Sequence, residues 1–143
     1  MRTHVPWQDD LLTGIASIDT VHRQIFVRFN QLLAACDRGR GSEELKRLVG
    51  FLDEYVLRHF DDEEALQREV GYPHLEKHRR EHQAFTVRLE ALKEKVRAQG
   101  TPVYLVVEAC RLLAELLFEH ISVSDAAFAA HVRTVRPQVT SPA

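Results

Sequence analysis

The chain has 143 residues, which is enough for one domain with a substantial buried core. Its hydrophobic content of 45% and charged content of 28% are typical of a soluble globular protein, and its formal net charge of -2 gives no electrostatic basis for binding nucleic acid or an anionic membrane. There is no apolar run of about 18 residues and no charged leader before an apolar stretch, so we predict neither a transmembrane helix nor a signal peptide and expect a cytoplasmic protein.

Residues 1–17 are predicted to form an extended N-terminal arm, because they show no sustained hydrophobic period. We expect Trp7 in this arm to cover one end of the core. A first helix should begin near Ile18, where interior positions recur at intervals of three and four: Ile18, His22, Ile25, Phe29, Leu32 and Cys36. Turn-forming residues 37–41 should end this helix.

A second helix is predicted from Ser42, a good N-cap residue, to Val70, just before Gly71 and Pro73. Its interior positions are Leu45, Leu48, Leu52, Tyr55, His59, Glu63, Leu66 and Val70. A third helix should end near Gln99 and Gly100, and its interior positions are His78, His82, Phe85, Leu89, Leu92 and Val96.

The fourth helix should start with Thr101 as its N-cap and Pro102 at the first helical position. Its interior positions are Val103, Val106, Cys110, Leu113, Leu117 and His120, and the sequence stays compatible with helix to Val135. Residues 136–143 are expected to form a frayed tail. Because neither cysteine belongs to a C-x-x-C pair and each falls in an apolar stripe, we expect Cys36 and Cys110 to be reduced and buried.

Four helices of roughly 20 residues joined by short loops predict an all-α fold, an antiparallel up-and-down four-helix bundle. We expect residues 18–135 to form this bundle within a single domain that spans residues 1–143.

Six polar side chains occupy positions that the helical period directs at the bundle axis: His22, His59, Glu63, His78, His82 and His120. Burying each without a partner would cost about 1–3 kcal/mol. Their places along the four helices put them all at the same end of an up-and-down bundle. One shared metal site would satisfy them together, so the pattern predicts such a site.

The remaining polar candidates are weaker. Asp125 follows His120 by five residues, an offset of about 140° on an ideal helix, so it would share a face with His120 only if that segment bulged or bent. His74 lies at the mouth of the third helix, and we do not expect it to be a ligand. His4 and His131 lie near the two ends of the chain. Asp61, Asp62 and Glu64 are expected to form a solvated face beside Glu63.

This pattern resembles the hemerythrin family, and within it the single-domain bacterial members. The resemblance runs from Trp7 to about Phe128 and includes all the spacings of His22, His59-x-x-x-Glu63, His78-x-x-x-His82 and His120-x-x-x-x-Asp125. It implies two non-heme iron ions with a bridging oxide or hydroxide. In that arrangement His78, His82 and His120 would hold one iron, and His22 and His59 would hold the other, which keeps an open position. Glu63 and Asp125 would bridge the two irons, and Asp19 would act behind the ligands or as a helix cap.

The resemblance implies reversible O2 binding for storage, delivery or buffering, rather than enzymatic catalysis. Five neutral imidazoles with only two carboxylates differ from the carboxylate-rich sites of ferritin-like di-iron enzymes, which agrees with a carrier. We expect an apolar O2 pocket walled by Phe60, Leu113, Leu116 and Leu117. Family members often carry tryptophan where this chain has Leu116, so the pocket should be wider and autoxidation faster.

The sequence leaves two alternatives to an O2 carrier. One is a sensor of O2, NO or redox state, and the other is a di-iron oxidoreductase that acts on NO or peroxide or oxidises iron. NO or other small anions are alternative ligands of the open iron, and zinc is an alternative metal. We expect no nucleic-acid or membrane partner and favour a monomer.

Overall fold

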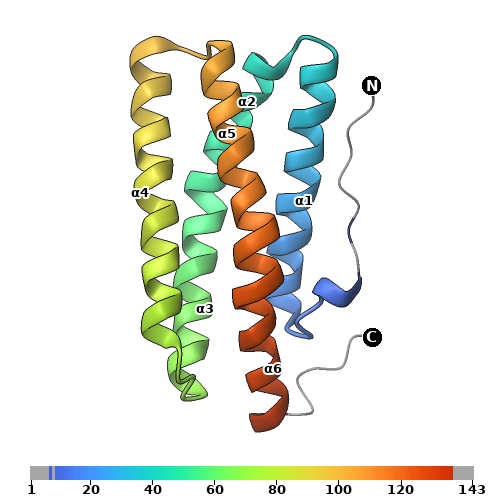
Figure 1. Ribbon diagram of the computed structural model, residues 1–143, viewed down its shortest axis with the longest axis vertical. Helices are drawn as coiled ribbons and strands as arrows, with labels where there is room; N and C mark the ends of the chain where they lie inside the picture. Colours follow the sequence, from blue (N-terminus) through green and yellow to red (C-terminus); the bar gives the residue numbers. More distant parts are fainter. Residues whose placement is uncertain (1–6, 8, 137–143) are drawn as a thin grey trace.

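Four helical rods run side by side in alternating directions (Figure 1). The computed structural model describes residue 7 and residues 9–136, and all regular secondary structure in that part is helical. The rods are α1 (Ala16–Asp37), the continuous helix α2 (Gly41–Phe51), η2 (Leu52–Val56) and α3 (Leu57–Glu69), then α4 (Leu75–Gln99), and the continuous helix α5 (Val103–Glu115), η3 (Leu116–Asp125) and α6 (Ala126–Val135). A short 3-10 helix, η1 (Asp9–Leu11), precedes them. The predicted antiparallel four-helix bundle is confirmed.

The turn before α1 is held by one buried carboxylate. Asp19 accepts hydrogen bonds from the Thr13 backbone N–H and hydroxyl, both at 2.8 Å, and from the Gly14 backbone N–H at 3.1 Å. Gly14 has a φ of 83°, which a residue with a side chain rarely adopts. Asp19 therefore holds the turn that leads into α1, although the N-cap position of α1 is Ile15 and has no side-chain cap.

Two of the predicted helix starts are wrong by one or two residues. Arg40, not Ser42, occupies the N-cap of α2, and Pro102, not Thr101, occupies the N-cap of α5. The Ser42 hydroxyl instead donates a hydrogen bond to the Thr101 carbonyl oxygen at 2.6 Å. This bond joins the α1–α2 and α4–α5 turns at the upper end of the bundle in Figure 1.

The core follows the predicted stripes with a few exceptions. Interior residues from all four rods form one continuous apolar cluster, which includes Ile25, Leu32, Leu45, Leu48, Leu52, Leu89, Leu92, Leu105, Leu113 and Leu117. Tyr55 is 47% exposed and Val103 is 74% exposed, although both were expected to face inward. Cys36 is also exposed and Cys110 is half-buried, so the expectation that both are buried is wrong.

Two of the rods contain a π-helical segment, in which the turn is wider than in an α-helix. Residues 52–56 form η2 and residues 116–125 form η3. The wider turn of η2 brings Val56, which is fully buried, to the interior in place of Tyr55. The segment η3 has a larger role, because it carries the C-terminal residues of the candidate site.

The prediction that residues 1–17 are extended is wrong in part, because η1 spans Asp9–Leu11 and α1 already begins at Ala16. The rest of the predicted arm and most of the predicted tail, residues 1–6, 8 and 137–143, lie outside the described residues. His4 is among them. The Trp7 ring packs edge-on against Phe26 of α1, with centroids 5.2 Å apart, so it covers the flank of the core at the middle of α1 rather than an end. Among the described residues, no helix is long and apolar enough to cross a membrane.

Candidate metal centre

All seven predicted ligand residues lie together at the end of the bundle where α1 and α4 begin and α3 ends, the lower end in Figure 1. One donor atom from each of five residues falls within 4.8 Å of the others: Glu63, His78, His82, His120 and Asp125. In a second group, one donor atom from each of His22, His59 and Glu63 also lies within 4.8 Å of the others. Each of the four rods contributes at least one donor.

Glu63 faces both groups of histidines, each with a different oxygen. Its Oε1 lies 2.7 Å from His78 Nε2 and 3.2 Å from His82 Nε2, whereas its Oε2 lies 3.5 Å from His59 Nε2. The carboxylate therefore spans the two groups.

Asp125 repeats this arrangement from the opposite rod. Its Oδ1 lies 2.8 Å from His78 Nε2 and 3.3 Å from His120 Nε2, and its Oδ2 lies 3.1 Å from His22 Nε2. The Nε2 atoms of His78 and His82 are 3.1 Å and 3.0 Å from His120 Nε2. Two carboxylates thus lie between a group of three histidines and a group of two.

The π-helical segment explains how Asp125 reaches the site. Residues five apart would diverge by about 140° on an α-helix, but a π-helix pairs residues five apart. Because η3 runs from Leu116 to Asp125, His120 and Asp125 share one face. The bulge that the sequence required for Asp125 to join the cluster is present.

Several of the donor atoms lack an aligned hydrogen bond, although His120 Nε2 lies within hydrogen-bond distance of the Nε2 atoms of His78 and His82. Both ring nitrogens of His22, both carboxylate oxygens of Glu63 and Oδ1 of Asp125 are buried and lack a hydrogen-bond partner among the described residues. Buried polar atoms of this kind are costly unless another group satisfies them. Metal ligands are expected to be arranged in this way, with buried donor atoms that converge on common points and lack hydrogen-bond partners.

The electrostatics of the cluster also favour cations. Burial raises the pKa of Asp125, but its histidine contacts, with His120 foremost, outweigh this and hold the pKa well below its usual range. The pKa of Glu63 is likewise lowered. Burial opposes protonation of His78, yet its contacts with Asp125 and Glu63 raise its pKa to about 10. Two buried carboxylates are thus compensated by protons on histidines, and metal cations can replace those protons.

The two histidine groups differ in their outer contacts. In the group of three, each Nδ1 has a side-chain partner: Gln67 Nε2 at 2.8 Å from His78, Glu64 Oε2 at 2.8 Å from His82, and Glu81 Oε1 at 3.1 Å from His120. The Ser124 hydroxyl donates a hydrogen bond to the same Glu81 oxygen. In the group of two, Nδ1 of His22 has no partner among the described residues.

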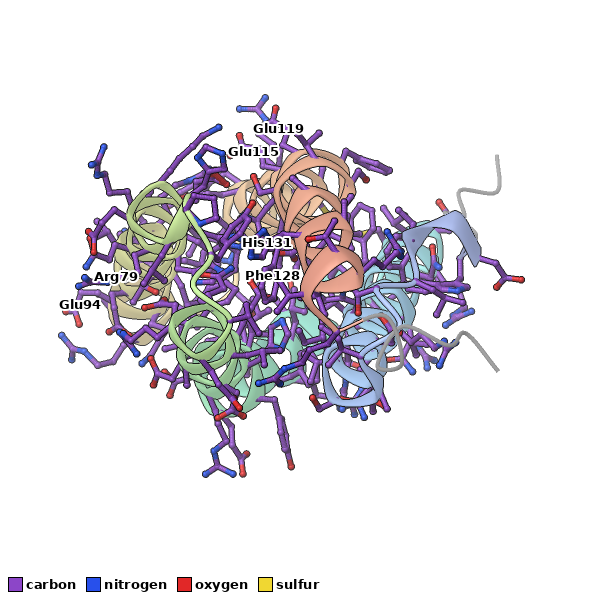
Figure 2. All side chains as sticks on the ribbon, turned by 90° about the horizontal axis from the view of Figure 1, so that it is seen from below. Arg79, Glu94, Glu115, Glu119, Phe128 and His131 are labelled. Atoms are coloured by element: carbon purple, nitrogen blue, oxygen red, sulfur yellow. The ribbon has the colours of Figure 1, made fainter. Side chains whose placement is uncertain are left out.

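Two cavities adjoin the cluster. One of about 400 Å³ reaches His82 and His120 between α4 and the α5–η3 rod, and Phe60 and Leu116 line it. Glu115 and Glu119 stand at its outer rim, where Figure 2 shows them at the edge of the bundle. A second cavity of about 360 Å³ adjoins His59 and is lined by Ile15, Ile18, Val21 and Leu66 among others.

Of the expected pocket walls, Phe60 and Leu116 therefore face the group of three histidines. The Phe60 ring stacks on His82 with centroids 3.9 Å apart. Leu113 and Leu117 are fully buried in the apolar core and line neither cavity.

The comparison with protein families agrees with this geometry. The model of the hemerythrin HHE cation binding domain matches residues 13–132. The chain belongs to the hemerythrin family. It is 34% identical to a bacteriohemerythrin of Pseudomonas paraeruginosa over 130 residues, which are 91% of this chain and 82% of that hemerythrin. A bacteriohemerythrin of Campylobacter jejuni is 30% identical over 109 residues, which are 76% of this chain and 80% of that protein.

Several residues around this hemerythrin site were missed or misplaced by sequence reasoning. Glu64 was expected on a solvated face, but only 14% of its side chain is exposed because it contacts His82. Gln67 is fully buried and follows Glu63 by four residues, so helical spacing was a usable signal for it. Glu81 and Tyr72 carried no comparable signal. The buried Tyr72 ring lies 6.4 Å from that of His78.

Of the other histidines, His74 and His131 are described, and both lie outside the cluster. His74 is exposed and packs against Tyr72 at the start of α4. His131 Nε2 lies 3.3 Å from the Val70 carbonyl oxygen, and Figure 2 shows His131 on α6 beside Phe128.

Proposed function

We propose that this chain binds O2 reversibly at a non-heme di-iron centre, for storage, delivery or buffering of oxygen. The observation that supports this most directly is the pair of carboxylates, each of which turns one oxygen toward two members of the group of three histidines and the other oxygen toward one member of the group of two. That arrangement suits two cations that share both carboxylates. Membership of the hemerythrin family supports iron as the metal.

In this proposal His78, His82 and His120 hold one iron, and His22 and His59 hold the other. Glu63 and Asp125 bridge them. The iron pair, together with a bridging oxide or hydroxide, supplies the electrons and the open position that reversible O2 binding needs. The group of two histidines offers fewer donors, so an iron held there would keep an open position.

The protein's own part is to hold the donors and limit access by water and protons. Glu63 and Asp125 are each 1% exposed, and the cavity beside His59 is lined mainly by apolar side chains. The pKa of His59 is lowered by burial to about 4, so its ring is neutral and ready to bind a cation at neutral pH. The seclusion of the donors from solvent limits the supply of protons to the site, which supports a carrier rather than an enzyme.

The central test is to load the full chain with Fe(II) without oxygen, admit air, and then remove O2 under vacuum. We expect about two irons per chain, an optical spectrum that appears with air and disappears under vacuum, and repeated cycles without net O2 consumption. Fewer than one iron per chain would refute the di-iron site. Sustained turnover of O2, NO or peroxide with an electron donor would instead support the oxidoreductase.

A matched pair of variants on α3 tests the ligand assignment. Glu63→Gln removes the charge that spans the two groups but keeps the side-chain size, so the bound iron should fall to about half or less. Asp61→Asn removes an exposed charge two residues earlier and should leave the iron content unchanged. Equal iron in both variants would contradict the bridging role of Glu63.

A further inference from the structure

A pair of cysteines lies away from the metal centre, where the C-terminal end of α1 meets α5. Cys36 is exposed in the last turn of α1, and Cys110 is half-buried in the middle of α5. These elements occupy the upper part of the bundle in Figure 1. Fourteen residues separate Cys36 from His22, which corresponds to about 20 Å along the helix. The pair is therefore spatially separate from the proposed iron ligands.

The packing of Gly41 shows how the Cys36 sulfur is directed. A β-carbon placed on Gly41 would lie 2.9 Å from Cys36 Sγ and 3.1 Å from a methyl carbon of Val106. Val106 precedes Cys110 by four residues, so both are on the same face of α5. The sulfur of Cys36 thus lies over Gly41 on the side that faces α5, at the contact of α1, α2 and α5.

The two thiols are close enough to influence each other. Burial raises the pKa of the Cys110 thiol to about 11, and the neighbouring Cys36 thiol contributes through its charge and a side-chain hydrogen bond. Cys110 is accordingly protonated and a weak nucleophile at neutral pH, whereas Cys36 is open to solvent. The pair thus combines an accessible thiol with an adjacent shielded one.

We propose that Cys36 and Cys110 are an oxidation site, at which an intramolecular disulfide forms and ties the end of α1 to α5. The oxidant class is a low-molecular-weight disulfide. The Cys36 thiolate attacks it, forms a mixed disulfide and releases one thiolate. Cys110 then loses its proton to solvent and attacks the Cys36 sulfur, which releases the second thiolate. Two protein thiols are oxidised, and one external disulfide is reduced to two thiols.

The test uses the full chain, reduced, freed of reductant and incubated with oxidised glutathione under nitrogen. We expect the intact mass to fall by two hydrogen atoms, the number of free thiols to fall from two to none, and the chain to stay monomeric on a non-reducing gel. The melting temperature should rise by roughly 5 °C or more, because the bond closes a long loop. A stable glutathione adduct on the wild type, or a covalent dimer through Cys36, would overturn the proposal.

The cysteine variants separate the two steps. The Cys110→Ser variant should form a mixed disulfide between Cys36 and one glutathione and react no further. The Cys36→Ser variant should react at least about ten times more slowly than the wild type because only the shielded thiol remains. Equal reaction rates for Cys36→Ser and the wild type would contradict the assigned order.

Two glycine variants in α2 test the geometry without touching either thiol. Gly41→Ala places a methyl group against the Cys36 sulfur and should slow ring closure, so the glutathione adduct accumulates. Gly50→Ala adds the same group where no atom lies within 4 Å and should behave as the wild type. If both variants form the disulfide at the wild-type rate, the Cys36 sulfur does not lie over Gly41.

Discussion

The side chains behind the histidines make the two halves of the metal centre unequal. Gln67, Glu64 and Glu81 each contact the outer nitrogen of one histidine in the group of three. Such contacts fix the ring orientation and the position of the proton in metal-binding histidines. His22 lacks a partner of this kind among the described residues. The group of three is therefore more rigidly held than His22, which has more freedom to adjust when a ligand enters.

We expect Gln67→Ala to weaken iron binding by about 10–100-fold while the helical content is retained. A histidine that binds metal through Nε2 carries its proton on Nδ1, and a half-turn of the Gln67 amide lets its oxygen accept a hydrogen bond from that N–H. Without Gln67 the His78 ring is less well oriented. Competition with a chromophoric chelator measures the affinity. Gln24→Ala, which changes an exposed glutamine of α1, is the control and should bind iron as the wild type does.

Leu116 lines the cavity that reaches His82 and His120 of the group of three histidines, and it is 3% exposed. Replacement by tryptophan should fill part of this space and hinder the entry of water and protons. We expect stopped-flow measurements to show slower autoxidation of Leu116→Trp than of the wild type. An unchanged or faster rate would mean that this cavity does not govern autoxidation.

At the scale of whole elements, the π-helical segment η3 is the feature on which the site depends. Its wider turn displaces backbone carbonyl groups from the regular α-helical pattern. The Ser122 hydroxyl donates a hydrogen bond to the Leu117 carbonyl oxygen five residues earlier, at 2.9 Å. This hydroxyl thereby adds a side-chain hydrogen bond within the segment that places Asp125.

Ser122→Ala should therefore destabilise the fold by about 1 kcal/mol, as judged by urea unfolding of the metal-free chain. Thr20→Ala is a matched control, because Thr20 donates to the Ala16 carbonyl oxygen four residues earlier in the regular helix α1. The Thr20 bond is exposed to solvent, whereas the Ser122 bond is partly buried, so the loss should be smaller for Thr20→Ala. An equal loss in the two variants would show that η3 does not depend on Ser122.

The same segments explain which parts of the elements were predictable from sequence. The intervals of three and four located all four rods and most of their buried faces, because apolar side chains must share one face of an α-helix. Tyr55 was misplaced because a π-turn shifts the register without an apolar signature of its own. Ser42 was misplaced because its hydroxyl bonds to Thr101, 59 residues away, and such a contact leaves no trace in local spacing.

The location of the donors, by contrast, could be predicted at the scale of the whole molecule. Alternating helix directions and the chain positions of the histidines were sufficient to bring His22, His59, His78 and His120 to one end. The supporting contacts of Glu64 and Glu81 were not predictable, since acidic residues beside a ligand usually face solvent. Which of several neighbouring acids turns inward depends on the packing of the facing rod.

Metal removal should lower the stability of the whole chain. Without cations, both oxygens of Glu63 and Oδ1 of Asp125 are buried and have no hydrogen-bond partner among the described residues. A ligand at about a thousand times its dissociation constant stabilises the folded state by about 4 kcal/mol. We expect chelation to lower the melting temperature by roughly 10 °C. Scanning calorimetry with and without chelator measures this, and the shift should largely vanish in Glu63→Gln.

The gathering of donors at one end has a consequence for how the folded chain opens. Bound cations would hold all four rods together there, whereas the far end is joined by the turns at 38–40 and 100–102 and by apolar contacts. Amide hydrogens near those turns should exchange with solvent first, and those around η3 last. Iron would then stabilise one end of the bundle only, and local unfolding would spread from the other end toward it.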